Sequence, residues 1–208
     1  IGDIARYDIN KMKKKMCIIG EELWYHTHGV DMSILQDKDK IKPIAKSFGT
    51  GQTLFRDYYQ PDVYQIILEG VDDVCRRLRV SKRRAQTVHL GIGYSKDSGG
   101  GFFRQIKLAT PTANESEIYK ACLHLYNTSY ENEPIRRVNV AVSSLTDEPG
   151  QQINLFEDIN HAIKEQQVFS ALDEIQFKYG KNSVTRASAE TKASTVKARN
   201  EMIGGHHA

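Results

Sequence analysis

Several features are missing from this sequence, and each absence excludes a class of protein or indicates a cellular location. It has no apolar run near the roughly 18 residues that a membrane-spanning helix requires, which excludes a helical membrane protein. Its three cysteines, Cys17, Cys75 and Cys122, lie far apart without a Cys-x-x-Cys pair, so we expect reduced thiols and a cytoplasmic location. The chain opens at Ile1 without Met, a basic segment or an apolar segment, so we expect a fragment of a longer protein and no signal peptide.

The composition that is present fits a folded, water-soluble chain. Apolar residues make up 39% and charged residues 26% of the 208 residues. This length accommodates one ordinary domain or two small ones, and the apolar fraction excludes a fully disordered protein.

Positive charge is concentrated in the first half of the chain. Residues 1–110 hold 19 Lys and Arg against 13 Asp and Glu, whereas residues 111–208 hold 10 against 13. The densest stretch has six cations in nine residues: Arg76, Arg77, Arg79, Lys82, Arg83 and Arg84. Such a stretch favours a polyanion as partner, or it complements the dipole at the end of a solvated helix.

Residues 1–31 predict short helices around a tight turn. The pattern is helical over 9–16, breaks at Cys17-Ile18-Ile19-Gly20 and resumes over 21–28. In a helix-hairpin-helix unit, a glycine at the turn allows close approach to a phosphate, and the following helix N-terminus binds that anion. An Ile-Gly turn between two helices that contacts no DNA is the alternative. Residues 31–41 lack periodicity and indicate a linker.

Residues 46–148 alternate between strand and helix periods. Apolar side chains recur at helical spacing over 61–78 and 114–126, and alternation marks the strands. The predicted strands are residues 46–54, 87–94, 102–109 and 137–144. The order β-α-β-β-α-β predicts an α+β fold in which a four-stranded antiparallel sheet carries both helices on one face and leaves the other face free.

The free face of this predicted sheet carries small, polar and basic residues, and nothing bulky is expected on it. These residues are Thr87, His89, Gly91, Gly93, Gln105, Lys107, Arg137 and Asn139. Arg104 falls on the apolar face instead. An RNA binder of this topology would carry stacking aromatics in an RNP1-type strand, a context that Phe102-Phe103 lacks. We therefore expect contact with a phosphate backbone rather than with base edges.

The last part of the chain, residues 149–208, departs from this pattern. A short apolar segment, Gln152–Phe156, follows Pro149-Gly150, and a C-terminal helix is predicted over 160–179. A tail rich in Ser, Thr and Ala begins at Lys181. We expect this tail either to pack poorly or to cover another surface.

Short motifs across nearly the whole chain together resemble a known family. Ile1–Ala5, Ile19–Trp24 and Gly29–Asp31 resemble the end of the thumb domain of Y-family translesion DNA polymerases. Lys46–Gly49, with Leu54 and Arg56–Tyr58, resembles the opening of their little finger domain. Gln152–Phe156 is similar to the bacterial clamp-binding motif Gln-Leu-x-Leu-Phe, with Ile153 where Leu is usual. Matches to the C-terminal region of the UmuC/ImpB branch are residues 171–175, Phe177, residues 179–182, 186–188 and 203–206.

The resemblance implies a division into four parts. These are a helical thumb remnant at 1–31, a linker at 32–45, the little finger at 46–148, and a clamp-binding motif, helix and tail at 149–208. Polymerases of this family use two Mg²⁺ ions held by palm carboxylates, which would precede Ile1. We therefore expect no catalytic residue, metal ligand or cofactor in this chain, and no polymerisation by the chain alone.

The resemblance also implies two partners for a region of an error-prone polymerase that acts in DNA damage tolerance. Primer–template DNA would be bound through its backbone phosphates, and the expected contacts are Gly20, Lys46, Ser47, Lys82, Arg83, Arg84, Arg104 and Lys107. The bacterial sliding clamp would be bound by Gln152, Ile153, Leu155 and Phe156. Two alternatives stay open: a clamp tether without DNA binding, and a ferredoxin-like RNA-binding domain that prefers single strands and depends on Phe102 or Phe103.

Overall fold

The computed structural model describes residues 1–31, 34, 45–147 and 159–202, with the backbone alone described for 159–163, 165 and 166. The chain forms two compact units, Ile1–Ile44 and Ala45–Ala208. Nearly all of the predicted linker, 32–45, lies outside the described residues. No helix in the described parts is long and apolar enough to cross a membrane.

The first unit contains two helices, α1 (Gly2–Ala5) and α2 (Ile9–Thr27). The side chain of Asp8 caps α2 by accepting a hydrogen bond from the backbone N–H of Lys11 at 2.9 Å. The helix is interrupted at Cys17, whose φ of 54° and ψ of −140° are not helical. The predicted break is therefore confirmed, and the positive φ within it falls on Cys17.

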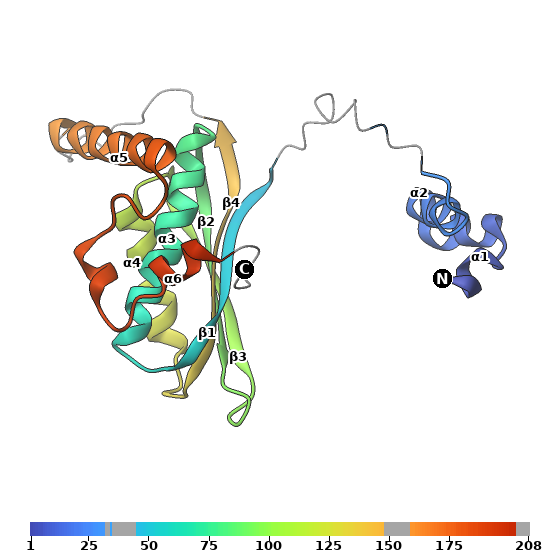
Figure 1. Ribbon diagram of the computed structural model, residues 1–208, viewed down its shortest axis with the longest axis horizontal. Helices are drawn as coiled ribbons and strands as arrows, with labels where there is room; N and C mark the ends of the chain where they lie inside the picture. The colour runs from blue at the N-terminus through green and yellow to red at the C-terminus, as the bar shows by residue number, and fades with distance from the viewer. Residues whose placement is uncertain (32–33, 35–44, 148–158, 203–208) are drawn as a thin grey trace. The chain divides into compact units, whose positions relative to one another are not determined.

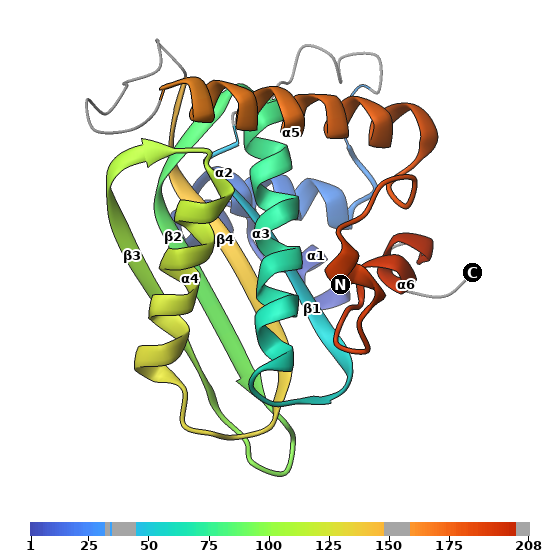
Figure 2. The same ribbon diagram turned by 90° about the vertical axis from the view of Figure 1, so that its left-hand side faces the viewer.

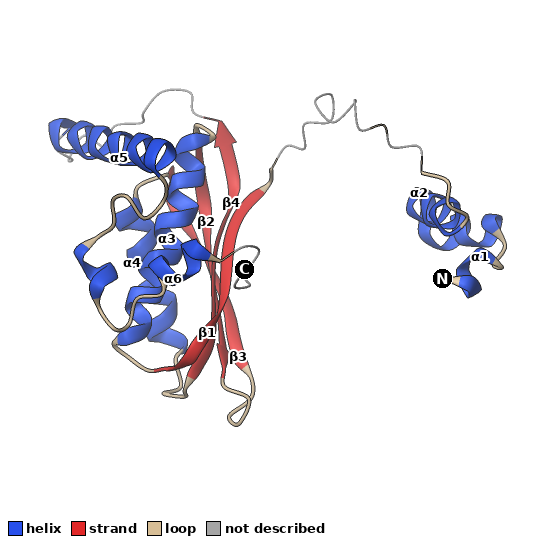
Figure 3. Ribbon diagram, viewed as in Figure 1, coloured by secondary structure: helices blue, strands red, loops and turns tan. Residues whose placement is uncertain are grey.

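The second unit is built around one sheet (Figures 1 and 3). Its first six elements are β1 (Ser47–Tyr58), α3 (Asp62–Val80), β2 (Arg83–Tyr94), β3 (Gly101–Thr112), α4 (Glu115–Ser129) and β4 (Ile135–Asp147). The strands lie in the order β1-β4-β2-β3, and every neighbouring pair is antiparallel. The predicted α+β order and the four-stranded antiparallel sheet are confirmed.

Both long helices of this sheet domain cover the same face of the sheet, as Figure 2 shows. The α3 helix packs on β1 and β4, and α4 packs on β2 and β3. Side chains at helical spacing on α3, such as Val63, Ile67 and Val71, are fully buried. They meet the alternating apolar side chains of the strands, such as Leu90 and Val140, so one face of the sheet forms the core.

The C-terminal region continues with α5 (Ile159–Tyr179), η2 (Ala187–Glu190) and α6 (Val196–Glu201), on the helix side of the sheet (Figure 2). Two ion pairs and one buried carboxylate attach it to α3. Asp173 pairs with Arg79, Arg186 pairs with Asp72, and Glu69 accepts hydrogen bonds from Ser194 and Thr195. Of the two expectations for the tail, its described part fulfils the second, because it covers the outer side of α3.

Candidate nucleic-acid interface

The sheet face opposite α3 and α4 is not covered by any described element of its own unit. Strand register places its side chains in four rows that run from β1 through β4 and β2 to β3. The rows are Thr53-Arg137-Gly93-Gly101, Gly51-Asn139-Gly91-Phe103, Gly49-Ala141-His89-Gln105 and Ser47-Ser143-Thr87-Lys107. We call this surface the free face. Because five of its positions are glycine, the backbone itself is open to close approach.

One end of the free face carries three exposed lysines. Lys107 lies in the last row, Lys46 directly precedes β1, and Lys82 directly precedes β2. Within the described residues, none of these side chains makes a hydrogen bond or ion pair. Ser47 is exposed in the same row as Lys107. These four predicted contacts therefore lie at the same end of the sheet, spread over its width.

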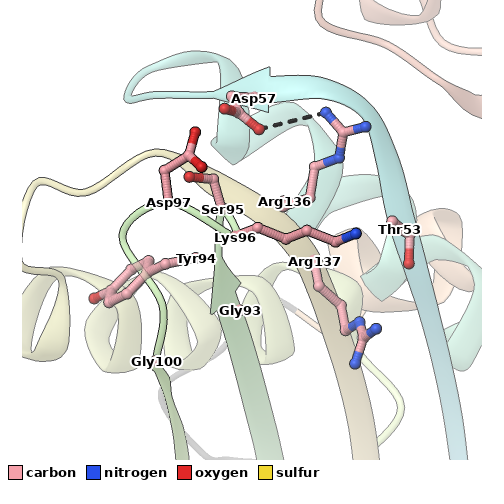
Figure 4. Close-up of a pocket in the computed structure, with 10 residues that line it drawn as sticks. All are labelled: Thr53, Asp57, Gly93, Tyr94, Ser95, Lys96, Asp97, Gly100, Arg136 and Arg137. Carbon is pink, nitrogen blue, oxygen red and sulfur yellow. Dashed lines mark hydrogen bonds and ion pairs between the residues drawn. The ribbon is translucent and has the colours of Figure 1, made fainter.

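A second cationic group lies at the opposite end of the free face. Lys96, in the β2–β3 loop, and Arg137, on β4, line a cavity of about 710 Å³ (Figure 4). Asp57 in this cavity already pairs with Arg136 at 3.4 Å, and Asp97 adds a second carboxylate. Three cations against two acids leave one net positive charge. Arg137 is six residues from the lysine-bearing row along β4, which separates the two cationic groups by about 20 Å.

Other predicted DNA contacts are placed differently. Arg83 is mostly buried and donates to Asp147 at 2.9 Å and to the carbonyl of Ala45 at 2.6 Å. Arg84 is half-buried and also engaged within the chain. Arg104 is exposed but pairs in register with the core residue Leu90, so it lies on the helix face of the edge strand, away from Lys107.

The dense basic stretch is therefore not one continuous patch. Arg76 and Arg77 both pair with Asp73, one turn earlier on α3. Arg79 pairs with Asp173 of α5. Three carboxylates, Asp73, Asp147 and Asp173, thus pair with four of the six cations, and three net positive charges remain over the stretch.

Gly20, the predicted phosphate contact in the first unit, packs against the other half of α2. It is buried, and a Cβ at this position would lie 2.5 Å from the carbonyl oxygen of Met12. Close approach of the two halves of α2 accounts for this glycine without a phosphate.

Two ring side chains on the free face were not expected together. Phe103 is 58% exposed, although the sequence pattern predicted no bulky group on this surface. Its position alternates with Gln105 and Lys107, so the strand period contained the signal. His89 lies beside it, and His89 Nε2 is 2.7 Å from Ser143 Oγ. Burial lowers the pKa of His89, so the imidazole is neutral at pH 7.

The clamp-binding segment and the expected absence of metal ligands are the two remaining expectations. The clamp-binding segment, Gln152 to Phe156, lies outside the described residues. Within the described residues, no three His, Cys, Asp or Glu side chains gather as metal ligands.

Comparisons with known proteins show which family this chain resembles. A family model described as "impB/mucB/samB family C-terminal domain" matches residues 45–155. A Bacillus subtilis (strain 168) protein provisionally named UV-damage repair protein UvrX is 37% identical over 211 residues, covering 99% of this chain and 49% of the relative. DNA polymerase IV 2 of the same organism is 33% identical over 210 residues, covering 100% of this chain and 50% of the relative.

A solved structure entitled "Complex of beta-clamp processivity factor and little finger domain of PolIV" aligns with a TM-score of 0.40 at 15% identity. The alignment covers 53% of this chain and 99% of the other. The chain spans about half the length of the curated relatives it matches. With more than half of its residues inside the family match, this chain belongs to the impB/mucB/samB family, and residues 45–155 are the C-terminal domain of that family.

Proposed function

We propose that the unit Ala45–Ala208 binds primer–template DNA along its sugar-phosphate backbone through the free face. The observation that carries the proposal is the pair of cationic groups at the two ends of a glycine-rich surface. Lysine and arginine side chains without an acidic partner are available to neutralise phosphates. The glycines between the two groups carry no side chains, so a duplex can lie close to the strands there.

Contact with phosphates rather than base edges suits a protein that acts on damaged DNA. A damaged base changes the groups that a side chain would read in a groove, whereas most phosphates keep their places. We therefore propose that this chain is the DNA-holding part of a translesion polymerase, and that it depends on a palm domain for chemistry. The names of its relatives, a DNA polymerase and a UV-damage repair protein, support this assignment.

The test is fluorescence anisotropy with a labelled primer–template duplex at several salt concentrations. Each phosphate contact contributes about 0.9 to the slope of log K against log salt. We expect Lys107→Ala and Arg137→Ala each to weaken binding and to lower the slope by about one contact. Lys120, exposed on α4 at the other side of the sheet, supplies the matched control Lys120→Ala. An equal loss in the control, or an absence of duplex binding at low salt, would contradict the proposal.

A second proposed function is tethering to a bacterial sliding clamp. Its support is the sequence Gln152-Ile153-Asn154-Leu155-Phe156, located between the end of β4 and the start of α5. Leu155 and Phe156 would supply apolar anchors, the side chains that carry most of the affinity in such short peptides. The double variant Leu155→Ala, Phe156→Ala is expected to lose clamp binding in surface plasmon resonance while its DNA affinity is unchanged. Retained clamp binding would reject the tether.

A further inference from the structure

Phe103 differs from the small, polar and basic side chains around it on the free face. Within the four described rows, it is the one large apolar side chain, and it is 58% exposed. Its neighbour Phe102 packs against the core from the opposite face. Packing against the core thus accounts for the apolar side chain of Phe102. It does not account for Phe103, whose ring is largely in contact with solvent.

The surroundings of Phe103 keep one side of the ring accessible. In register, Phe103 lies opposite Gly91, and Gly93 and Gly101 occupy the next row. A Cβ on Gly91 would come within 3.1 Å of the Phe103 ring, so the ring lies against the bare backbone there. The ring fills the space over Gly91, and its 58% exposure leaves the side turned away from the sheet open to a flat ligand.

His89 extends the aromatic surface. Its ring and that of Phe103 are 5.8 Å apart between centroids, with 27° between their planes. The hydrogen bond with Ser143 restricts rotation of the imidazole. Two nearly parallel rings, held in place on an open sheet face, form an arrangement suited to nucleobase stacking.

A phosphate-binding group lies within reach of these rings. Arg137 is next to Gly93 in the row beside Phe103, two strands and two residues away, or about 12 Å between backbone positions. In Figure 4 the side chains of Lys96 and Arg137 extend toward Thr53 of β1, away from β3, so their charges lie farther from the rings than the backbone positions do. A base on the rings and a phosphate at these cations would therefore belong to different nucleotides of one extended strand.

We propose that Phe103 and His89 form a stacking platform for an unpaired base of single-stranded DNA, whose backbone phosphate contacts Arg137 and Lys96. Bases inside a duplex are covered by their neighbours, so only an unpaired base offers a free face to the rings. The single-stranded template beyond the primer end supplies such bases. This inference rests on the proposed DNA binding, and it adds a contact that distinguishes an overhang from a duplex.

The experiment compares two labelled DNAs, a blunt duplex and the same duplex with a single-stranded overhang that carries 2-aminopurine. We expect wild-type protein to bind the overhang substrate more tightly and to quench the 2-aminopurine by stacking. Phe103→Ala should weaken overhang binding about tenfold, the scale of aromatic–base stacking, and leave the blunt duplex within twofold. Phe103→Tyr, which keeps the ring, should retain both affinity and quenching.

Phe177→Ala is the matched control, because Phe177 on α5 is 96% exposed and lies on the helix side of the sheet. If Phe103→Ala loses affinity equally for both DNAs, or for neither, the stacking platform is overturned. Duplex binding by the wild type would in that case still support the proposed function. Absence of wild-type binding to both DNAs would overturn the proposed function itself. Tighter binding of a matching RNA overhang than of the DNA overhang would overturn the assignment to single-stranded DNA.

Discussion

Arg79 and Asp173 form a two-pronged ion pair that joins α3 to α5 across 94 residues of sequence. Arg79 Nε donates to Asp173 Oδ2 at 2.7 Å, and Nη2 donates to Oδ1 at 3.0 Å. The guanidinium also lies 4.8 Å from the centre of the Phe169 ring. Arg79 therefore serves to dock the C-terminal helix, which is why it is absent from the proposed DNA contacts.

Replacing Arg79 by Lys should loosen α5, because an ammonium group cannot reproduce the two parallel hydrogen bonds. Both side chains are 17% exposed, between the surface and buried cases, so we expect a loss of about 2 kcal/mol in the free energy of unfolding. Urea unfolding measures the loss, and amide hydrogen exchange locates it on α5. Arg76→Lys is the control, since its ion pair is local to α3. Equal effects of the two variants would contradict this role.

Glu69 is expected to hold the segment that follows η2. Its buried carboxylate accepts hydrogen bonds from the hydroxyl of Ser194 at 2.7 Å and from the hydroxyl and backbone N–H of Thr195 at 2.8 and 3.2 Å. Glu69→Gln places an amide N–H₂ group among these donors. We expect trypsin to cleave after Lys192 and Lys197 about tenfold faster. The loss of the charge-assisted hydrogen bonds should raise about tenfold the fraction of molecules in which this segment is detached from α3.

The matched control for Glu69 is Gln65→Ala, one turn away on α3. This variant removes a single donor to Glu69 and keeps the bonds to Ser194 and Thr195. Cleavage at the wild-type rate in Glu69→Gln would show that other contacts hold the segment.

Glu115 gives the stability of the fold a dependence on pH. Burial, together with hydrogen bonding to Asp72, raises the pKa of Glu115 to about 8 from 4.5, and Arg186 only partly offsets this. Between these values the folded chain keeps a proton that the unfolded chain releases. The free energy of unfolding contributed by this group therefore falls as pH rises from about 5 to about 8.

Glu115→Gln is expected to flatten that part of the pH profile, because the amide is uncharged throughout and still offers N–H donors to Asp72. Urea unfolding at several pH values measures the slope. Glu117→Gln, in the same first turn of α4, should keep the wild-type slope. Parallel profiles for wild type and Glu115→Gln would contradict the raised pKa.

Local sequence pattern predicted the sheet well, since strand alternation depends only on neighbouring residues. Val88, Leu90 and Ile92 alternate with Thr87, His89 and Gly91, which separates the core face from the free face without knowledge of the partner strands. The ends of strands were less predictable: β1 continues to Tyr58 and β2 begins at Arg83, beyond the regular alternation.

The distribution of charge could not be predicted in the same way. Arg186 pairs with Asp72 across 114 residues, and Arg83 pairs with Asp147 across 64. Such partners are set by packing and leave no local pattern in the sequence. By contrast, Phe103 was predictable, because its position on the strand assigns it to the face of Gln105 and Lys107.

Amide NMR mapping of the chain titrated with primer–template DNA tests the central claim most directly. We predict that the largest shift changes fall on the free face and its ends, led by the backbone amides of Gly49, Gly51, Gly91 and Gly93 and by Lys107 and Arg137. Amides of α3 and α4, on the other side of the sheet, should stay nearly unchanged. Shift changes confined to α3, α4 or α5 would contradict the account, because DNA would then contact the helix side.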